Sequence, residues 1–328
     1  MEGNCMNNVI DFEDNTLMKP VKPSERDCCR QGCIPCVFDI YEQELKIWEE
    51  ECRKIVSGKD SEKSKVTEGG PVLKQMEYSV FVVQSIKQET MDSYRVRISL
   101  PPGATLGMTI GQHLIIRGMV DGELVTRQYT PITTVNQKSY FDLLIKVYPE
   151  GKMSRYVNTW QVGTKVEMRG PFGNFAYRPN QHRCLFMLAA GTGITPMAQV
   201  VQGILDNPDD ETIIHLLYSC VTYTSVLLKP EIDEWGKFWN FSVLFCLSHE
   251  QDTGNYKYKY GERIHLGRLD LSRLQEEMGK FVDNCFVLIC GTQSFEEDMI
   301  RHVTNLKVPK RIAVGKLTLN SGLVELRF

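Results

Sequence analysis

Residues 183–207 read RCLFMLAAGTGITPMAQVVQGILDN, and this stretch decides the fold of the C-terminal half of the chain. Its first eight residues are too apolar to expose one face to water, which predicts a strand buried on both sides. Gly191 and Gly193 then form a turn, and Pro196 lies in the first turn of an expected helix. The turn lacks the lysine of a P-loop and the full G-x-G-x-x-G spacing, so by itself it fits either a phosphate site or a plain strand-to-helix turn.

Three more apolar runs follow in this half, at 212–220, 241–248 and 284–291. Helical or mixed patterns separate the runs, at 197–207, 270–278 and 295–306. Buried strands that alternate with helices predict a parallel sheet. We therefore expect an α/β domain over 181–328.

The preceding region, 74–180, has a different pattern. Six short segments rich in branched and aromatic residues are separated by turns, at 79–86, 94–100, 111–118, 124–132, 141–148 and 165–170. Asp121-Gly122 between two of them is typical of a hairpin turn. This pattern predicts a small antiparallel β-barrel. The expected fold is thus all-β plus α/β: an antiparallel barrel followed by a parallel-sheet domain.

The N-terminal region, 1–55, is rich in cysteine and is followed by a polar linker at 56–73. Apolar residues recur at helical spacing from Val37 to Trp48, which predicts one amphipathic helix. The candidate metal ligands before it are Cys28, Cys29, Cys33 and Cys36. Their spacing favours a structural zinc ion, while a metal-free cap and an iron–sulfur cluster stay open as alternatives.

Composition narrows the class of protein. The 328 residues are 42% hydrophobic and 24% charged, as in ordinary globular proteins. A net charge of −3 argues against a nucleic-acid partner. The sequence contains no apolar run of 18 residues and begins without the features of a signal peptide, so we expect no transmembrane segment. The 11 cysteines are most compatible with reduced thiols, which predicts a cytoplasmic location.

Two stretches of the barrel region carry candidate ligand-binding residues. Arg127 and Tyr129 lie two residues apart, so on a strand they share one face. A fixed cation beside a flat ring suits a ligand with a phosphate and an aromatic ring system, although an ordinary surface strand has the same pattern. The segment Gly151–Ser154 reads GKMS and begins a short helical pattern, where free amide groups favour a second phosphate.

The segments RQYTPI, IKVY, GKMS, RGPFG, AAGTGITPM and CGTQSF occur in this order along the chain. Their order and spacing resemble those of the NADH–cytochrome b5 reductase family, over about 74–328. The resemblance implies that FAD lies between the two domains and that NADH or NADPH is the electron donor. The N-terminal region resembles the short oxidoreductase-like N-terminal domain, whose biochemical role this resemblance does not supply.

The resemblance also implies roles for individual residues. Arg127, Tyr129 and Thr130 would hold the flavin phosphate and ring, while GKMS would hold the pyrophosphate. Thr130, Lys146 and Cys290 would act in catalysis, at the flavin edge and beside the nicotinamide nucleotide. The residues implied in cofactor binding are Arg127, Tyr129, Thr130, Ile145, Val147, Tyr148, Gly151, Lys152, Met153, Ser154, Gly191, Thr192, Gly193, Thr195, Pro196 and Gly291.

The implied reaction is hydride transfer from the nicotinamide to the flavin, followed by release of single electrons to a haem protein such as cytochrome b5. A quinone or an iron–sulfur acceptor is an alternative, and so is a binding or adaptor protein with weak nucleotide use. The sequence departs from the family pattern at CGTQSF, where the family has CGPPPM. It also has Ser248 where NADH-selective members carry an acidic residue, which predicts a relaxed preference between NADH and NADPH.

Overall fold

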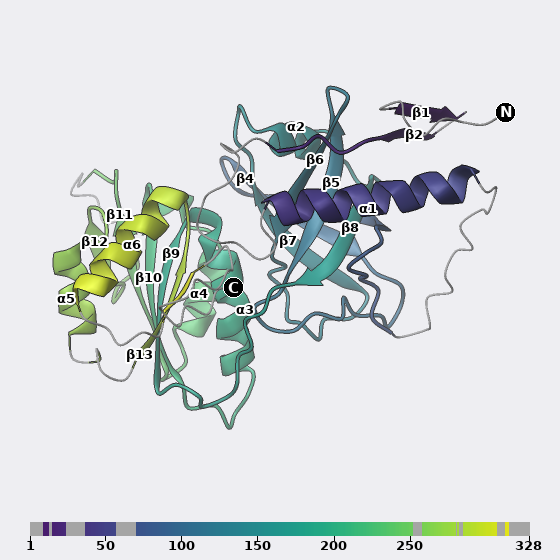
Figure 1. Cartoon of the computed structure of the whole chain (residues 1–328). Coiled ribbons are helices and arrows are strands. Elements are labelled where there is room, and N and C mark those ends of the chain that lie inside the picture. Colours follow the sequence, from purple (N-terminus) through teal and green to yellow (C-terminus); the bar gives the residue numbers. More distant parts are fainter. Residues whose placement is uncertain are drawn as a thin grey trace.

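The computed structural model describes residues 9–12, 15–23, 37–56, 70–251, 258–279, 281, 285–306 and 312–314. A β-rich half and an α/β half lie side by side, and a long helix lies across the β-rich half (Figure 1). The two expected sheets are both present, one antiparallel and one parallel, which confirms the predicted fold class.

The β-rich half is one antiparallel sheet of six strands in the order β6-β5-β8-β3-β4-β7. The strands are β3 (Ser79–Thr90), β4 (Ser93–Ser99), β5 (His113–Val120), β6 (Glu123–Tyr129), β7 (Tyr140–Lys146) and β8 (Lys165–Phe172), with the short helix α2 (Lys152–Asn158) before β8. Asp121 and Gly122 have φ values of 50° and 74°, which confirms the predicted hairpin turn between β5 and β6. Inward side chains such as Leu143, Val166 and Met168 form a fully buried core.

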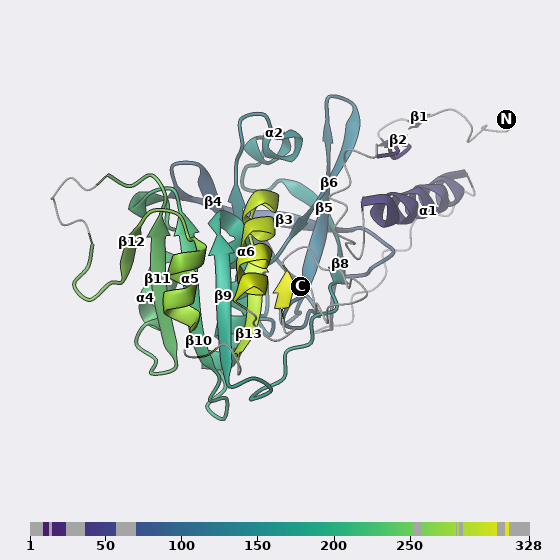
Figure 2. The same cartoon turned by 60° about the vertical axis from the view of Figure 1, so that its left-hand side comes forward.

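The α/β half is a parallel sheet in the order β12-β11-β10-β9-β13-β14. The strands are β9 (Cys184–Ala190), β10 (Ile213–Cys220), β11 (Phe241–Leu247), β12 (Ile264–Leu266), β13 (Cys285–Cys290) and β14 (Ile312–Val314). Helices α3 (Ile194–Leu205) and α4 (Lys229–Trp235) pack on one face, while α5 (Leu271–Met278) and α6 (Gln293–Asn305) cover the other (Figure 2). Helices on both faces explain why the central strands are apolar throughout.

The N-terminal region contributes a hairpin of β1 (Val9–Phe12) and β2 (Asn15–Met18), followed by helix α1 (Val37–Val56). Ile47, Trp48 and Cys52 of α1 are buried, which confirms the predicted amphipathic helix. One end of α1 lies near the junction of the two halves (Figure 1). None of the helices in the described ranges is long and apolar enough to cross a bilayer.

Hydrogen bonds from α3 join the two halves. The Gln199 side chain accepts a bond of 3.0 Å from the amide of Gly111 and donates one of 3.2 Å to the carbonyl of Pro131. One turn further on, the Gln202 amide donates to the carbonyl of Ile132 at 3.0 Å. Because these bonds are directional, they fix the position of α3 relative to the end of β6.

Candidate active site

A cavity of about 870 Å³ lies where the two halves meet. Its volume is within the range of roughly 300–1,000 Å³ that is usual for pockets holding small molecules. The walls come from β5, β6, β7 and α2 of the antiparallel half, from the start of α3 and the end of β13, and from the N-terminal region. Most of the residues that the sequence predicted at a cofactor line this one cavity.

Strand β6 supplies Arg127 and Tyr129 to the cavity, and Thr130 follows directly. The Arg127 side chain is exposed and donates to the carbonyl of Thr126 at 2.7 Å. Burial raises the pKa of Tyr129 to about 12, so its hydroxyl stays protonated near neutral pH. The β6 end therefore offers a cation, a flat ring and hydroxyl groups within one cavity.

Strand β7 and helix α2 form the next wall. Lys146 and Tyr148 line the cavity, whereas Ile145 is only 1% exposed and packs in the barrel core with Val147 against it. The alternation of a strand explains this difference, so any ligand contact from Ile145 or Val147 would have to come from the main chain. Lys146 Nζ lies 2.9 Å from a carboxylate oxygen of Asp92.

Gly151, Lys152, Met153 and Ser154 also line the cavity. The Ser154 hydroxyl oxygen accepts a hydrogen bond of 2.9 Å from the main-chain amide of Tyr148. This bond fixes the start of α2 to the end of β7. Lys152 forms an ion pair with Glu123 of β6, a residue that the sequence motifs did not single out.

The α/β half presents the start of α3 beside the end of β13. Thr192, Gly193, Thr195 and Pro196 line the cavity together with Cys290 and Gly291, and the Gly191 carbonyl accepts a 2.9 Å hydrogen bond from the Tyr218 hydroxyl. A Cβ atom on Gly193 would lie only 2.1 Å from the carbonyl oxygen of Cys290. Glycine is thus required here because the α3 loop contacts the CG segment directly, in addition to any close approach to phosphate.

Two buried polar residues at this site belong to none of the motifs that the sequence analysis identified. Glu296, in the first turns of α6, is 1% exposed and accepts a 3.1 Å hydrogen bond from the Gly291 amide. It thereby fixes the CG loop that lacks the prolines of the family pattern. His113, at the start of β5, is also buried and lines the cavity, and burial lowers its pKa to about 4.

The Nε2 atom of His113 has no hydrogen-bond partner within the described part of the chain. A buried polar atom of this kind normally meets a ligand or water. Together with the cavity volume and the cation and ring from β6, it makes the residues present a good fit to a flavin dinucleotide.

Ser248 directly follows β11, and its hydroxyl lies 2.9 Å from Nδ1 of His249. Glu250, two residues later, accepts a 2.6 Å hydrogen bond from the amide of Tyr223. A carboxylate therefore lies close to Ser248 along the chain, although not at the position where the family pattern has one.

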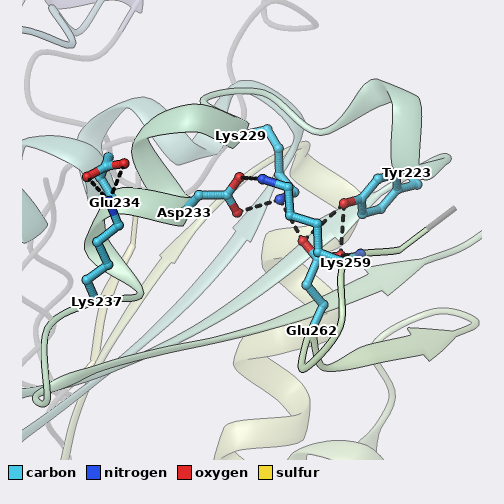
Figure 3. Close-up of polar contacts among 7 residues, drawn as sticks. All are labelled: Tyr223, Lys229, Asp233, Glu234, Lys237, Lys259 and Glu262. Atoms are coloured by element: carbon cyan, nitrogen blue, oxygen red, sulfur yellow. Dashed lines mark hydrogen bonds and ion pairs between the residues drawn. The ribbon is translucent and has the colours of Figure 1, made fainter.

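The segment 258–262 is held against α4 by ion pairs and a hydrogen bond (Figure 3). Glu262 accepts a 2.8 Å hydrogen bond from the Tyr223 hydroxyl and pairs with Lys229 at 2.6 Å. Asp233 pairs with Lys229 and with Lys259. Both lysines of this cluster are thus paired with carboxylates of the same domain (Figure 3).

The four predicted metal ligands, Cys28, Cys29, Cys33 and Cys36, lie outside the described residues. Cys52 of α1 is buried. Over the ranges that the structure describes, no three His, Cys, Asp or Glu side chains form a group able to hold a metal ion.

Comparison with known proteins agrees with this site. Residues 80–177 match the oxidoreductase FAD-binding domain family, residues 187–301 match the oxidoreductase NAD-binding domain family, and residues 17–57 match the N-terminal domain of oxidoreductase-like proteins. The β-rich half, the α/β half and the N-terminal region thus each match a separate oxidoreductase domain family.

Individual relatives cover most of the chain. A Mus musculus protein named NADH-cytochrome b5 reductase-like is 40% identical over 299 residues, covering 89% of this chain and 93% of the relative. NADH-cytochrome b5 reductase 1 of Dictyostelium discoideum is 34% identical over 255 residues, 76% of this chain and 86% of the relative. The crystal structure of the cytochrome b5 reductase domain of Ulva prolifera nitrate reductase has a TM-score of 0.66 and 25% identity, covering 79% of this chain and all of that domain. The chain therefore belongs to the NADH–cytochrome b5 reductase family and is an FAD- and NAD-binding oxidoreductase.

Proposed function

We propose that this enzyme oxidises NADH and passes the electrons one at a time to a haem protein of the cytochrome b5 type. The observation that carries the proposal is the single cavity that gathers the β6 end, the start of α2, the start of α3 and the CG segment. The names of the relatives from Mus musculus and Dictyostelium discoideum support cytochrome b5 as the acceptor. A quinone or an iron–sulfur protein is the alternative acceptor.

The antiparallel half would hold FAD. Arg127 would neutralise a flavin phosphate, and Tyr129 would pack against the ring system with its protonated hydroxyl as a donor. Thr130 would donate a hydrogen bond at the flavin edge. The amides at the start of GKMS, Gly151–Ser154, would hold the pyrophosphate. When bound, FAD supplies a hydride acceptor that can release electrons singly.

The α/β half would hold the nicotinamide nucleotide along Gly191–Pro196 and Cys290-Gly291. Lys146 would attract the nucleotide phosphates, and Thr195 would approach the flavin from the side opposite Thr130. The contact between Gly193 and the Cys290 carbonyl would set the relative positions of the two nucleotide-binding loops. The work of these residues is to orient both cofactors and to exclude water.

The electron donor is NADH in this proposal, with NADPH as a second substrate. Ser248 supports the relaxed preference because a serine does not repel the 2′-phosphate of NADPH as a carboxylate would. Glu250 lies nearby but is bonded to the amide of Tyr223.

An absorption spectrum of the purified protein, recorded anaerobically before and after NADH or NADPH, tests the proposal. We expect flavin bands that bleach with NADH and recover when oxidised cytochrome b5 is added. A protein that binds no added FAD contradicts the proposal as a whole. A flavin that NADH bleaches but cytochrome b5 does not reoxidise contradicts only the acceptor.

A structural zinc at the N-terminal cysteines and a cytoplasmic location stay predictions from the sequence. Elemental analysis of the purified full chain tests the zinc. We expect close to one zinc ion per chain and loss of the metal when Cys33 and Cys36 are both replaced by serine.

A further inference from the structure

The wall of the cavity that neither nucleotide-binding half supplies comes from the N-terminal region. Four residues of α1, namely Val37, Ile40, Tyr41 and Glu44, line the cavity. They lie at helical spacing on its first turns. A short segment, residues 20–23, lines the same cavity. The residue before it, Lys19, has its ammonium group 5.6 Å from the ring centre of Trp48, which ties the segment to α1.

A buried ion pair fixes the position of α1. Glu44 is 4% exposed and Arg169 of β8 is fully buried, with Arg169 Nη2 2.7 Å from Glu44 Oε1. The Tyr78 hydroxyl donates to the same Glu44 oxygen at 2.8 Å. Burial, first of all, raises the pKa of Tyr78, and the Glu44 charge adds to this, so the hydroxyl remains a donor. Three side chains from distant parts of the sequence thus meet in one desolvated cluster.

A second anchor lies further along α1. Glu51 accepts a hydrogen bond of 2.9 Å from Arg117 of β5, and Arg117 also pairs with Glu167 of β8 at 2.6 Å. Two ion-pair clusters about two helical turns apart therefore fix both the position and the direction of α1 on the sheet. A helix held in this way is a fixed part of the cavity wall.

The α1 wall differs chemically from the wall at the end of β6. Val37 and Ile40 are apolar and Tyr41 is aromatic, whereas Arg127 of β6 and Thr130, which follows β6, are polar. A flavin ring system has the same asymmetry, with a hydrocarbon edge and a polar edge. The α1 side chains therefore suit the hydrocarbon edge of the ring system.

Two buried polar atoms point to a ligand at this wall. Glu44 Oε2 and His113 Nε2 each have no hydrogen-bond partner in the described part of the chain. Both residues line the cavity. A chain of contacts joins them, because the Arg169 guanidinium lies 4.8 Å from the Phe172 ring and the His113 ring lies 6.1 Å from the same ring.

We infer that the first turns of α1 are a wall of the flavin site, which retains FAD and shields the flavin ring system from solvent. The oxidoreductase-like N-terminal region is then a component of the cofactor site rather than a separate module. This inference rests on the proposed use of FAD, and it assigns to Ile40 and Tyr41 the contact with the bound flavin.

The first test is the double variant Ile40→Ala/Tyr41→Ala with Lys46→Ala as its control, since Lys46 is exposed on the same helix. FAD is titrated into flavin-free protein and followed by flavin fluorescence. We expect the dissociation constant to rise about tenfold or more, because each lost apolar contact with a bound ligand weakens binding. Iodide should also quench the fluorescence of the bound flavin more strongly. An unchanged dissociation constant and unchanged quenching, with normal helix content, would overturn the inference.

The second test uses the unaltered full chain, so it does not depend on how a variant folds. Hydrogen exchange of residues 37–44 is compared with and without saturating FAD. We expect slower exchange of these amides when FAD is bound, and little change in the C-terminal turns of α1. Equal exchange in both states overturns the inference even if NADH still reduces the flavin, which leaves the proposed function intact. A chain that binds no FAD overturns both.

Discussion

Replacing Gly193 with alanine tests how the α3 loop and the CG segment depend on each other. Gly193 has φ −60°, a helical value that alanine adopts without strain. The backbone itself would therefore tolerate the change. The added Cβ, however, would lie 2.1 Å from the carbonyl oxygen and 2.5 Å from the carbonyl carbon of Cys290.

The size of the displacement follows from these distances. Ordinary contact begins at 3.4 Å, so the Cβ and the Cys290 oxygen must separate by 3.4 − 2.1 = 1.3 Å. Both atoms belong to loops that end buried elements, and the main chain cannot rotate away as a long side chain can. A misplacement of about 1 Å between reacting groups can lower a rate about 100-fold. We expect a loss of this order in flavin reduction by NADH.

Stopped-flow absorbance under anaerobic conditions measures that rate directly. The control is Gly236→Ala, because Gly236 has φ −61° and a Cβ there would meet its nearest neighbour at 3.5 Å. We expect the control to reduce its flavin at the normal rate. A Gly193→Ala protein with normal FAD content and a normal reduction rate would refute the reasoning, since the two loops would then be able to separate without affecting the cofactors.

Three further changes have defined outcomes. Glu44→Gln leaves the buried Arg169 without its counter-charge, so urea denaturation should show a free energy of unfolding lower by about 3–5 kcal/mol. The control Glu51→Gln should lower it by less than about 1 kcal/mol, because Arg117 keeps its ion pair with Glu167. Burial lowers the pKa of His113 from 6.5 to about 4 in the folded chain. As the pH falls, the unfolded chain therefore takes up a proton at His113 before the folded chain does. The flavin-free protein should lose about 3 kcal/mol of stability as the pH falls from 6.5 to 4, and His113→Phe should remove this loss. Ser248→Asp should raise the ratio of kcat/KM for NADH over NADPH about tenfold or more in steady-state assays, and an unchanged ratio would mean that Ser248 lies away from the 2′ position.

The parts of the fold that the sequence predicted are those with a repeated local pattern. Each long buried strand of the α/β half is a continuous apolar run, and α1 has an unbroken helical spacing from Val37 to Trp48. Strands β12 and β14 were not predicted because each has three residues, too few to show a period. The segment before β12 is polar, and tertiary ion pairs to α4 rather than local propensity hold it in place.

The site residues that the sequence predicted are those that a motif groups within one turn or at the end of one strand. Glu296, Gln199 and Glu44 were missed because each acts through a partner that is distant in the sequence or has no pattern of its own. Glu44 did leave a signal. It lies within the apolar stripe of α1, three residues after Tyr41 and three before Ile47, where a carboxylate is costly unless it is paired. The sequence could thus have indicated a buried partner, but not that the partner is Arg169.

Gln199 links helix α3 to the segment that follows β6, beside the cavity. Thr195 and Gln199 lie four residues apart on α3 and therefore share a face of that helix. Gln199 donates to the carbonyl of Pro131, which directly follows Thr130. This hydrogen bond between the halves thus also sets Thr195 relative to Thr130, the two hydroxyls proposed to approach the flavin. Ile132 and Leu144 of the β-rich half pack in the same apolar cluster as α3, so the directional bond of Gln199 fixes a distance at a junction that apolar packing also holds together.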